Sequence, residues 1–180
     1  MAMRDSQSWK TLLKRRPLDT IIETGTYRAV NTIMLSGLFQ TVHSIEMSKT
    51  LYDEAVDKCK GIPNIHLHHG DSALVLPSLA INQPAYYFLD AHWCLTKPAS
   101  TQNNCFPLWR ELEFLSNRPY SDVIIVDDVH AFENKSVSTD NKRYHNQWNG
   151  VNKVSILEAI SKNKQVVECF EFEDVFVVYV

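Results

Sequence analysis

The chain has 180 residues, which is enough for one well-buried core and too few for two ordinary domains. Hydrophobic residues make up 44% of it and charged residues 22%, an ordinary profile for a globular protein. The formal net charge of −3 argues against a general nucleic-acid binder, because such proteins neutralise phosphates with an excess of Lys and Arg.

The cysteines and the N-terminal segment indicate the cellular setting. None of the four cysteines sits in a Cys-x-x-Cys pair, so neither a zinc knuckle nor a redox motif is indicated, and a reducing compartment is the simplest expectation. The first residues lack an apolar signal core, and no stretch approaches 18 apolar residues. We therefore expect a cytoplasmic protein without a membrane span.

Apolar runs alternate with helical patterns along the whole chain. The first half predicts a helix over 6–15, a strand at Thr20–Glu23, a helix over Tyr27–Phe39, a strand at Val42–Glu46, a helix capped by Ser48, a strand from Ile65 and a short helix ending at Leu79. The second half predicts a strand at Ala85–Asp90, a helix containing Leu108, Leu112 and Leu115, a strand at Asp122–Asp127, a helix over Val151–Ser161 and strands at Gln165–Phe172 and Val175–Val180.

This order of elements predicts the fold class. Strands that alternate with helices imply right-handed crossovers and a parallel sheet covered on both faces. The last two strands, joined at Glu173-Asp174, look like a hairpin that adds an antiparallel strand. We predict an α/β fold, a Rossmann-like, doubly wound and mostly parallel sheet with a C-terminal antiparallel hairpin strand. A single domain spans residues 1–180, with polar loops at 91–105 and 131–150.

Four of the predicted strands end on acidic residues, namely Glu23, Glu46, Asp90, and Asp127 with Asp128. In open parallel sheets, ligands bind outside the carboxyl ends of the strands. Carboxylates are costly beside a hydrophobic sheet unless they meet partners, so four of them on one rim indicate a functional site.

The loop Glu23-Thr24-Gly25-Thr26 follows the first strand and leads into a helix. Gly25 permits a tight turn, although the full three-glycine fingerprint of dinucleotide sites is absent, and a plain strand-to-helix turn is the alternative. Glu46 ends the next strand, where an acid commonly binds ribose hydroxyls. After the third strand, Asp71 and Ser72 could reach an adenine amino group or could simply cap a helix.

The order of these motifs carries a resemblance. Taken together, Ile22-Glu-Thr-Gly-Thr-Tyr, Ser44-Ile-Glu46, His69-Gly-Asp-Ser72, Phe88-Leu-Asp-Ala-His92 and Ile125-Val-Asp-Asp-Val-His130 resemble the class I S-adenosylmethionine-dependent methyltransferase fold. More narrowly, the chain is similar to small bacterial methyltransferase-like proteins that read Glu-Thr-Gly-Thr and Leu-Asp-Ala-His, and the helix Phe106–Glu113 fits that subgroup. The resemblance covers the chain from about Asp19 to Val180.

The resemblance implies roles for individual residues. Glu23 and Gly25, in the loop with Thr24 and Thr26, would lie against the methionine part of S-adenosylmethionine, Glu46 would bind the ribose, and Asp71 with Ser72 would lie near the adenine. The chain departs from many relatives at Ala29 and Val30, where they place a glycine and a small polar residue.

Asp90, Asp127 and Asp128 are candidate metal ligands, because oxygen-only ligand sets suit Mg²⁺ or Ca²⁺. Some O-methyltransferases of this fold hold a divalent ion at this place, where it would lower the pKa of the acceptor oxygen. The alternative is that one Asp caps a helix and another binds backbone amides.

Histidines near these acids are candidate bases. His92 is the preferred base, beside Asp90, and His130 is the reserve, because an imidazole near neutrality can remove a hydroxyl proton. A structural histidine bonded to a carboxylate is the alternative at both positions. His66 and His68 share one face of a strand and, with His69, are interpreted as surface residues.

Among the aromatic residues, Trp93 and Trp148 are candidate walls of the substrate site, and Trp109 is expected in the core. The leading hypothesis is a methyltransferase that methylates an oxygen of a small hydroxylated acceptor such as a sugar, with a homo-oligomer as an option. The alternatives are a metal-dependent hydrolase or lyase that uses Asp90, His92, Asp127 and Asp128, or a non-catalytic cofactor-binding protein.

Overall fold

The computed structural model describes residues 5–91, 106–132 and 148–180. The strands are β1 (Thr20–Thr24), β2 (Thr41–Glu46), β3 (Ile65–His69), β4 (Tyr86–Leu89), β5 (Val123–Val126), β6 (Glu168–Phe172) and β7 (Val175–Tyr179). The helices are α1 (Ser6–Arg15), α2 (Val30–Ser36), α3 (Lys49–Cys59), α4 (Ser72–Val75) with the 3₁₀ turn η1 (Leu76–Ser78), α5 (Leu108–Ser116), α6 (Val129–Phe132) and α8 (Lys153–Ser161).

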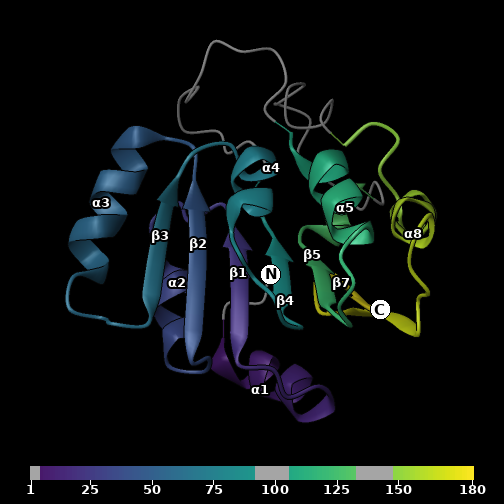
Figure 1. The fold of residues 1–180 in the computed structure, drawn as a ribbon, viewed down its shortest axis with the longest axis horizontal. Coiled ribbons are helices and arrows are strands. Elements are labelled where there is room, and N and C mark those ends of the chain that lie inside the picture. Colours follow the sequence, from purple (N-terminus) through teal and green to yellow (C-terminus); the bar gives the residue numbers. More distant parts are fainter. Residues whose placement is uncertain (1–4, 92–105, 133–147) are drawn as a thin grey trace.

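The strands form one sheet of seven strands in the order β3-β2-β1-β4-β5-β7-β6 (Figure 1). Strands β1 to β5 are parallel, whereas β7 pairs antiparallel with both β5 and β6. The predicted doubly wound, mostly parallel sheet with an antiparallel C-terminal hairpin is therefore confirmed. The chain runs outward from β1 to β3 and then restarts at β4 on the other side, so the switch point lies between β1 and β4, where ligands bind in such sheets.

Helices cover both faces of the sheet and enclose two apolar clusters. On one face, α1 and α2 pack against β1, β4, β5 and β7 around the fully buried Trp9, whose ring meets Phe39 and Phe88 edge-on. On the other face, η1, α5 and α8 pack around residues such as Leu112 and Ile124 (Figure 1). No helix within the described ranges is long and apolar enough to cross a membrane.

The structure differs from the predicted bounds mainly at helix starts. The helix expected from Tyr27 begins at Val30, because Tyr27 (φ 48°) and Ala29 (φ 60°) adopt the left-handed conformation and keep this segment a loop. The helix expected from Val151 begins at Lys153, where the side chain of Asn152 caps it by accepting from Ser155 N. The first strand of the hairpin begins at Glu168 rather than Gln165.

Candidate functional site

The loop after β1 lies directly against the end of β4. The N–H groups of Gly25 and Thr26 both donate to the carbonyl of Ile45, at 2.9 and 3.2 Å, so the loop is fixed to β2. Gly25 has φ +88°, and a Cβ atom there would lie 2.5 Å from the carbonyl oxygen of Asp90. This position therefore accepts glycine for two reasons, the conformation and the close approach of the neighbouring backbone.

The carboxylate of Glu46 joins the loops that follow β1 and β2. One oxygen accepts from the N–H of Tyr27 and the other from the N–H of Ser48, both at 2.8 Å. The side chain is buried. Because a carboxylate has about four lone-pair sites, two acceptor sites stay available for hydroxyl donors such as those of a ribose. Ribose binding by Glu46 stays a prediction that this geometry permits.

The carboxyl group of Glu23 lies under the loop, on the α2 side of the sheet. It accepts from Thr32 Oγ1 at 2.5 Å and from Ser44 Oγ at 2.6 Å, and Ser44 is also paired with Thr26 Oγ1 at 2.7 Å. Burial raises the pKa of Glu23 to about 8, although the two hydroxyl hydrogen bonds favour the charged form. Glu23 thus supports the loop from below. The contact of Glu23 with the methionine part of the cofactor stays a prediction.

The loop after β3 is held by α5. Asp71 caps α4 by accepting from Ala73 N at 3.0 Å, and its other oxygen accepts from Arg110 at 2.9 Å. The hydroxyl of Ser72 donates to Glu111 Oε1 at 2.5 Å. The two residues predicted to contact adenine therefore have their side chains positioned by consecutive residues of one helix.

Glu111 is a site residue that the sequence analysis missed. It is 1% exposed, and burial raises its pKa to about 7, while hydrogen bonds from Ser72 and Thr24 oppose that rise. It lines a hollow beneath the carboxyl ends of β4 and β5, together with Leu89, Phe106, Val126 and Trp148. The signal was present in the sequence, since Glu111 interrupts the apolar stripe Leu108, Leu112 and Leu115 on α5.

The three carboxylates predicted to bind a metal come from neighbouring strand ends. Backbone hydrogen bonds from Asp90 N to Thr24 O (3.1 Å) and from Asp127 N to Leu89 O (3.2 Å) keep the ends of β1, β4 and β5 together. Asp127 and Asp128 are buried. Within the described part of the chain, however, the three-ligand group whose atoms lie within 4.8 Å of one another consists of Asp128, His130 and Asp174.

His130 is held by the turn between β6 and β7. Its N–H donates to Asp174 Oδ1 at 2.9 Å, and its Nδ1 lies 2.5 Å from Asp174 Oδ2 and 3.9 Å from Asp128 Oδ1. The side chain of His130 is 39% exposed and that of Asp174 is 13% exposed. A carboxylate bound to Nδ1–H fixes the tautomer that leaves Nε2 as the acceptor nitrogen, which is the arrangement of a general base with its orienting acid.

The remaining residues of the sequence-based prediction are His92 and three tryptophans. His92 and Trp93 lie outside the described residues. Trp148 is buried against Phe106, with ring centroids 4.9 Å apart, so it forms part of the wall of the hollow. The expectation for Trp109 is wrong: 37% of it is exposed, because α5 turns its neighbours Leu108 and Leu112 inward instead.

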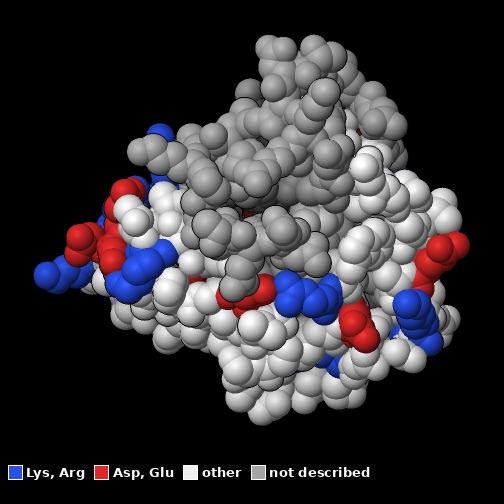
Figure 2. Space-filling model, turned by 90° about the horizontal axis from the view of Figure 1, so that it is seen from above, with Lys and Arg blue, Asp and Glu red and all other residues white. Residues whose placement is uncertain are grey.

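This arrangement gathers polar groups along the carboxyl edge of the sheet. Gly25, Glu46 and Asp71 border the β1–β3 side of the edge, and Asp128 with His130 borders the β5 side. Seen from above this edge, acidic and basic atoms are interspersed over the described surface (Figure 2). Chemically, the edge combines hydrogen-bond acceptors for hydroxyl and amino groups with an oriented imidazole.

Sequence similarity to known proteins covers part of the chain. No protein-family model matches the chain. Over 67 residues, 36% of its length, it is 39% identical to a protein-L-isoaspartate O-methyltransferase of Burkholderia vietnamiensis and 37% identical to one of Burkholderia pseudomallei. The matched segment covers 22% and 21% of those proteins, so the chain spans about a fifth of the length of the curated relatives it matches.

Solved structures match along nearly the whole chain. An O-methyltransferase from Bacillus cereus in complex with S-adenosylhomocysteine (SAH) superposes with a TM-score of 0.66 at 17% identity, covering 99% of this chain and 84% of that one. A SAM-dependent methyltransferase from Aquifex aeolicus gives a TM-score of 0.58 at 16% identity, covering 98% and 93%. The chain therefore has the Rossmann-like fold of S-adenosylmethionine-dependent methyltransferases.

Proposed function

We propose that the protein is an S-adenosylmethionine-dependent methyltransferase that methylates an oxygen of a small hydroxylated acceptor, with sugars as the first class to test. The observation that carries the proposal is the match of 99% of the chain to an O-methyltransferase in complex with SAH. The strand-end carboxylates support it, since this chain places Glu46 and Asp71 at the ends of β2 and β3, where that fold offers acceptors to a nucleoside.

The cofactor, when bound, supplies a methyl group that its sulfonium charge already activates. The residues of this chain then have two tasks, to align the acceptor oxygen and to remove its proton. Gly25 lets the loop after β1 lie against the backbone of Asp90. The loop proposed to hold the cofactor therefore lies next to the end of β4. Glu46 would hold the ribose hydroxyls, and Asp71 with Ser72 would meet the adenine.

Proton removal is the role that we assign to histidine. His130 has the geometry of a base within the described residues, because Asp174 binds its Nδ1 and leaves Nε2 to accept a proton. His92 follows Asp90 by two residues and is the second candidate. No step of the proposal requires Mg²⁺, and the Mg²⁺ site at Asp90, Asp127 and Asp128 stays a separate prediction.

Transfer of a labelled methyl group from S-adenosylmethionine to a panel of sugars and phenols tests this proposal. We expect labelled product with at least one hydroxylated acceptor. Cofactor binding without transfer to any acceptor would instead favour a non-catalytic cofactor-binding protein. Hydrolysis or cleavage of a substrate upon addition of Mg²⁺, without cofactor binding, would favour a metal-dependent hydrolase or lyase and contradict the proposal.

A further inference from the structure

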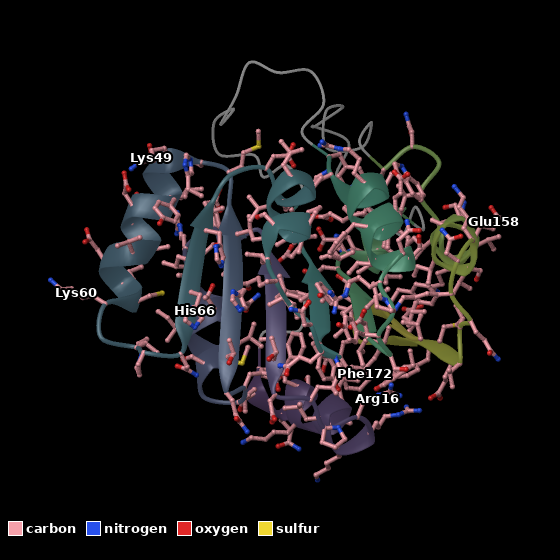
Figure 3. All side chains as sticks on the ribbon, in the orientation of Figure 1. Arg16, Lys49, Lys60, His66, Glu158 and Phe172 are labelled. Carbon is pink, nitrogen blue, oxygen red and sulfur yellow. The ribbon has the colours of Figure 1, made fainter. Side chains whose placement is uncertain are left out.

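Three histidines gather on one face of the sheet, on the two outer strands β2 and β3. His43 lies on β2, and His66 and His68 lie on β3. The parallel register places His43 opposite His66, and side chains two positions apart on a strand point to the same side. All three imidazoles therefore share a face at the outer part of the sheet, where β3 is the edge strand and Figure 3 labels His66.

The same face of β3 carries no covering helix in the described part of the chain. The alternate residues Ile65 and Leu67 pack on α3, next to Ala55 and Cys59. In Figure 1, α4 lies in front of β1, and α3 lies beside the outer edge of β3. His66 is exposed, while His43 and His68 are intermediate in burial, so an ion from solvent can reach the cluster.

Two of the three rings are in contact through their nitrogen atoms. His43 Nδ1 lies 3.0 Å from His68 Nε2, and the centroids of these two rings are 5.3 Å apart with an angle of 20° between their planes. The ring of His66 also stacks on that of His43, with ring centroids 5.0 Å apart and an angle of 27° between the ring planes. One nitrogen of the first pair must donate and the other accept, so the pair holds a single proton between two lone pairs.

The cluster is also kept in the protonation state that binds metals. Burial lowers the pKa of His43 to about 4 and lowers that of His68, and the neighbouring imidazoles act in the same direction. Neutral imidazole is the form that coordinates a metal ion, so the direction of both shifts is the one that favours binding.

We propose that His43, His66 and His68 form a binding site for a transition-metal ion of the Zn²⁺ class. Three imidazoles with a fourth position open to water make up a common zinc ligand set. In a tetrahedral site with Zn–N bonds of about 2.0–2.1 Å, the ligand nitrogens lie roughly 3.3 Å apart, close to the 3.0 Å between His43 and His68.

Binding needs the ring of His66 to turn toward the other two, because the ligand nitrogens of the three imidazoles do not all lie within 4.8 Å of one another. The ion takes the place of the shared proton, which moves through solvent to the outer nitrogen of the ring that held it. The rings turn about their terminal side-chain torsions, and each neutral ring then carries its one proton on the nitrogen that faces away from the ion. Nitrogen ligands select Zn²⁺, Cu²⁺ or Ni²⁺ over Mg²⁺. The ion would cross-link β2 to the edge strand β3. This site does not depend on the proposed methyl transfer.

Metal titration of the full chain, without a polyhistidine tag and after chelator treatment, tests the proposal. We expect one Zn²⁺ per chain by calorimetry, a tetrahedral Co²⁺ absorption spectrum, and no competition by Mg²⁺. His66→Gln, which changes an exposed side chain, should weaken Zn²⁺ binding by roughly 100-fold or more, because it removes one of the three protein ligands. His68→Gln should act similarly.

Two matched variants serve as controls. His69→Gln changes the adjacent residue, which lies beside Tyr52 with ring centroids 5.3 Å apart and should leave Zn²⁺ affinity unchanged. His130→Gln changes the Asp128–His130–Asp174 group and should also leave it unchanged. Unaltered affinity in both His66→Gln and His68→Gln, loss of binding in His130→Gln instead, or no Zn²⁺ binding at millimolar concentration would each overturn the proposal.

Discussion

Buried charges lie at both ends of the sheet, and the two ends use them differently. At the amino end, Asp122 is fully buried and accepts from Arg118 Nε at 2.9 Å, Lys164 at 3.3 Å and Ala85 N at 3.1 Å. Arg118 also donates to the carbonyls of Ile81 and Gln83. At the carboxyl end, the buried Glu46 accepts two backbone N–H groups.

The difference lies in the acceptor capacity that each end has left. Asp122 accepts hydrogen bonds on both oxygens from two cations and an amide. We call Asp122, Arg118 and Lys164 the amino-end cluster. It has no acceptor site left on Asp122, and it joins α5, β5 and the segment before β6. Glu46 keeps half of its capacity for another molecule. Similar burial therefore uses up the acceptor capacity at the amino end of the sheet and leaves part of it unused at the carboxyl end, where we propose the cofactor site.

Breaking the amino-end cluster should produce the largest change. Asp122→Ala leaves the guanidinium of Arg118 and the ammonium of Lys164 buried without their carboxylate, so we expect the free energy of unfolding to fall by about 3–5 kcal/mol. Urea denaturation of the variant and of the unchanged chain measures this difference in the free energy of unfolding. The folded fraction should bind SAH as the unchanged chain does, and a loss of stability below about 1 kcal/mol would contradict the structural role of the cluster.

At the carboxyl end, His130→Gln should lower the rate of methyl transfer by about 100- to 10,000-fold while SAH affinity stays constant, because a general base acts on the acceptor and not on the cofactor. Asp174→Asn should lower the rate less, since an amide oxygen at this position can still accept from Nδ1–H and orient the ring. His69→Gln is the control.

If His130→Gln and Asp174→Asn leave the rate unchanged while His92→Ala abolishes it, the base is His92. In that case the His130–Asp174 pair would be structural, like the amino-end cluster.

A smaller effect concerns the buried carboxyl of Glu111. Its pKa is raised from 4.5 to about 7 by burial, so between these pH values the folded protein holds a proton that the unfolded chain has released. Stability should therefore fall as pH rises through this window, by at most about 1.4 kcal/mol per pH unit.

Glu111→Gln should remove that part of the pH dependence, whereas Glu113→Gln, at an exposed position of the same helix, should not. Denaturation at pH 5, 6, 7 and 8 measures the difference. Identical pH profiles for Glu111→Gln and the unchanged chain would show that Glu111 does not titrate there.

The sequence predicted the parts of the molecule that depend on local pattern. Apolar runs ending on acids located β1, β2, β4 and β5, and right-handed crossovers then implied the parallel sheet. It missed the left-handed residues Tyr27 and Ala29, because neither is a residue type that favours that conformation. The contact of Asp174 with His130 spans 44 residues, so no spacing rule could find it. Glu111 could have been found from its place in an apolar stripe.

The central claim is that the carboxyl edge of the sheet binds S-adenosylmethionine, and calorimetric titration with SAH tests it most directly. We expect saturable binding of one SAH per chain, weakened by about 1–3 kcal/mol in Glu46→Ala through the loss of its hydroxyl partners, with unfolding checked in parallel. The same titration with Mg²⁺ present examines the separate metal prediction. No SAH binding by the folded wild-type chain, or equal affinity in Glu46→Ala, would contradict the account.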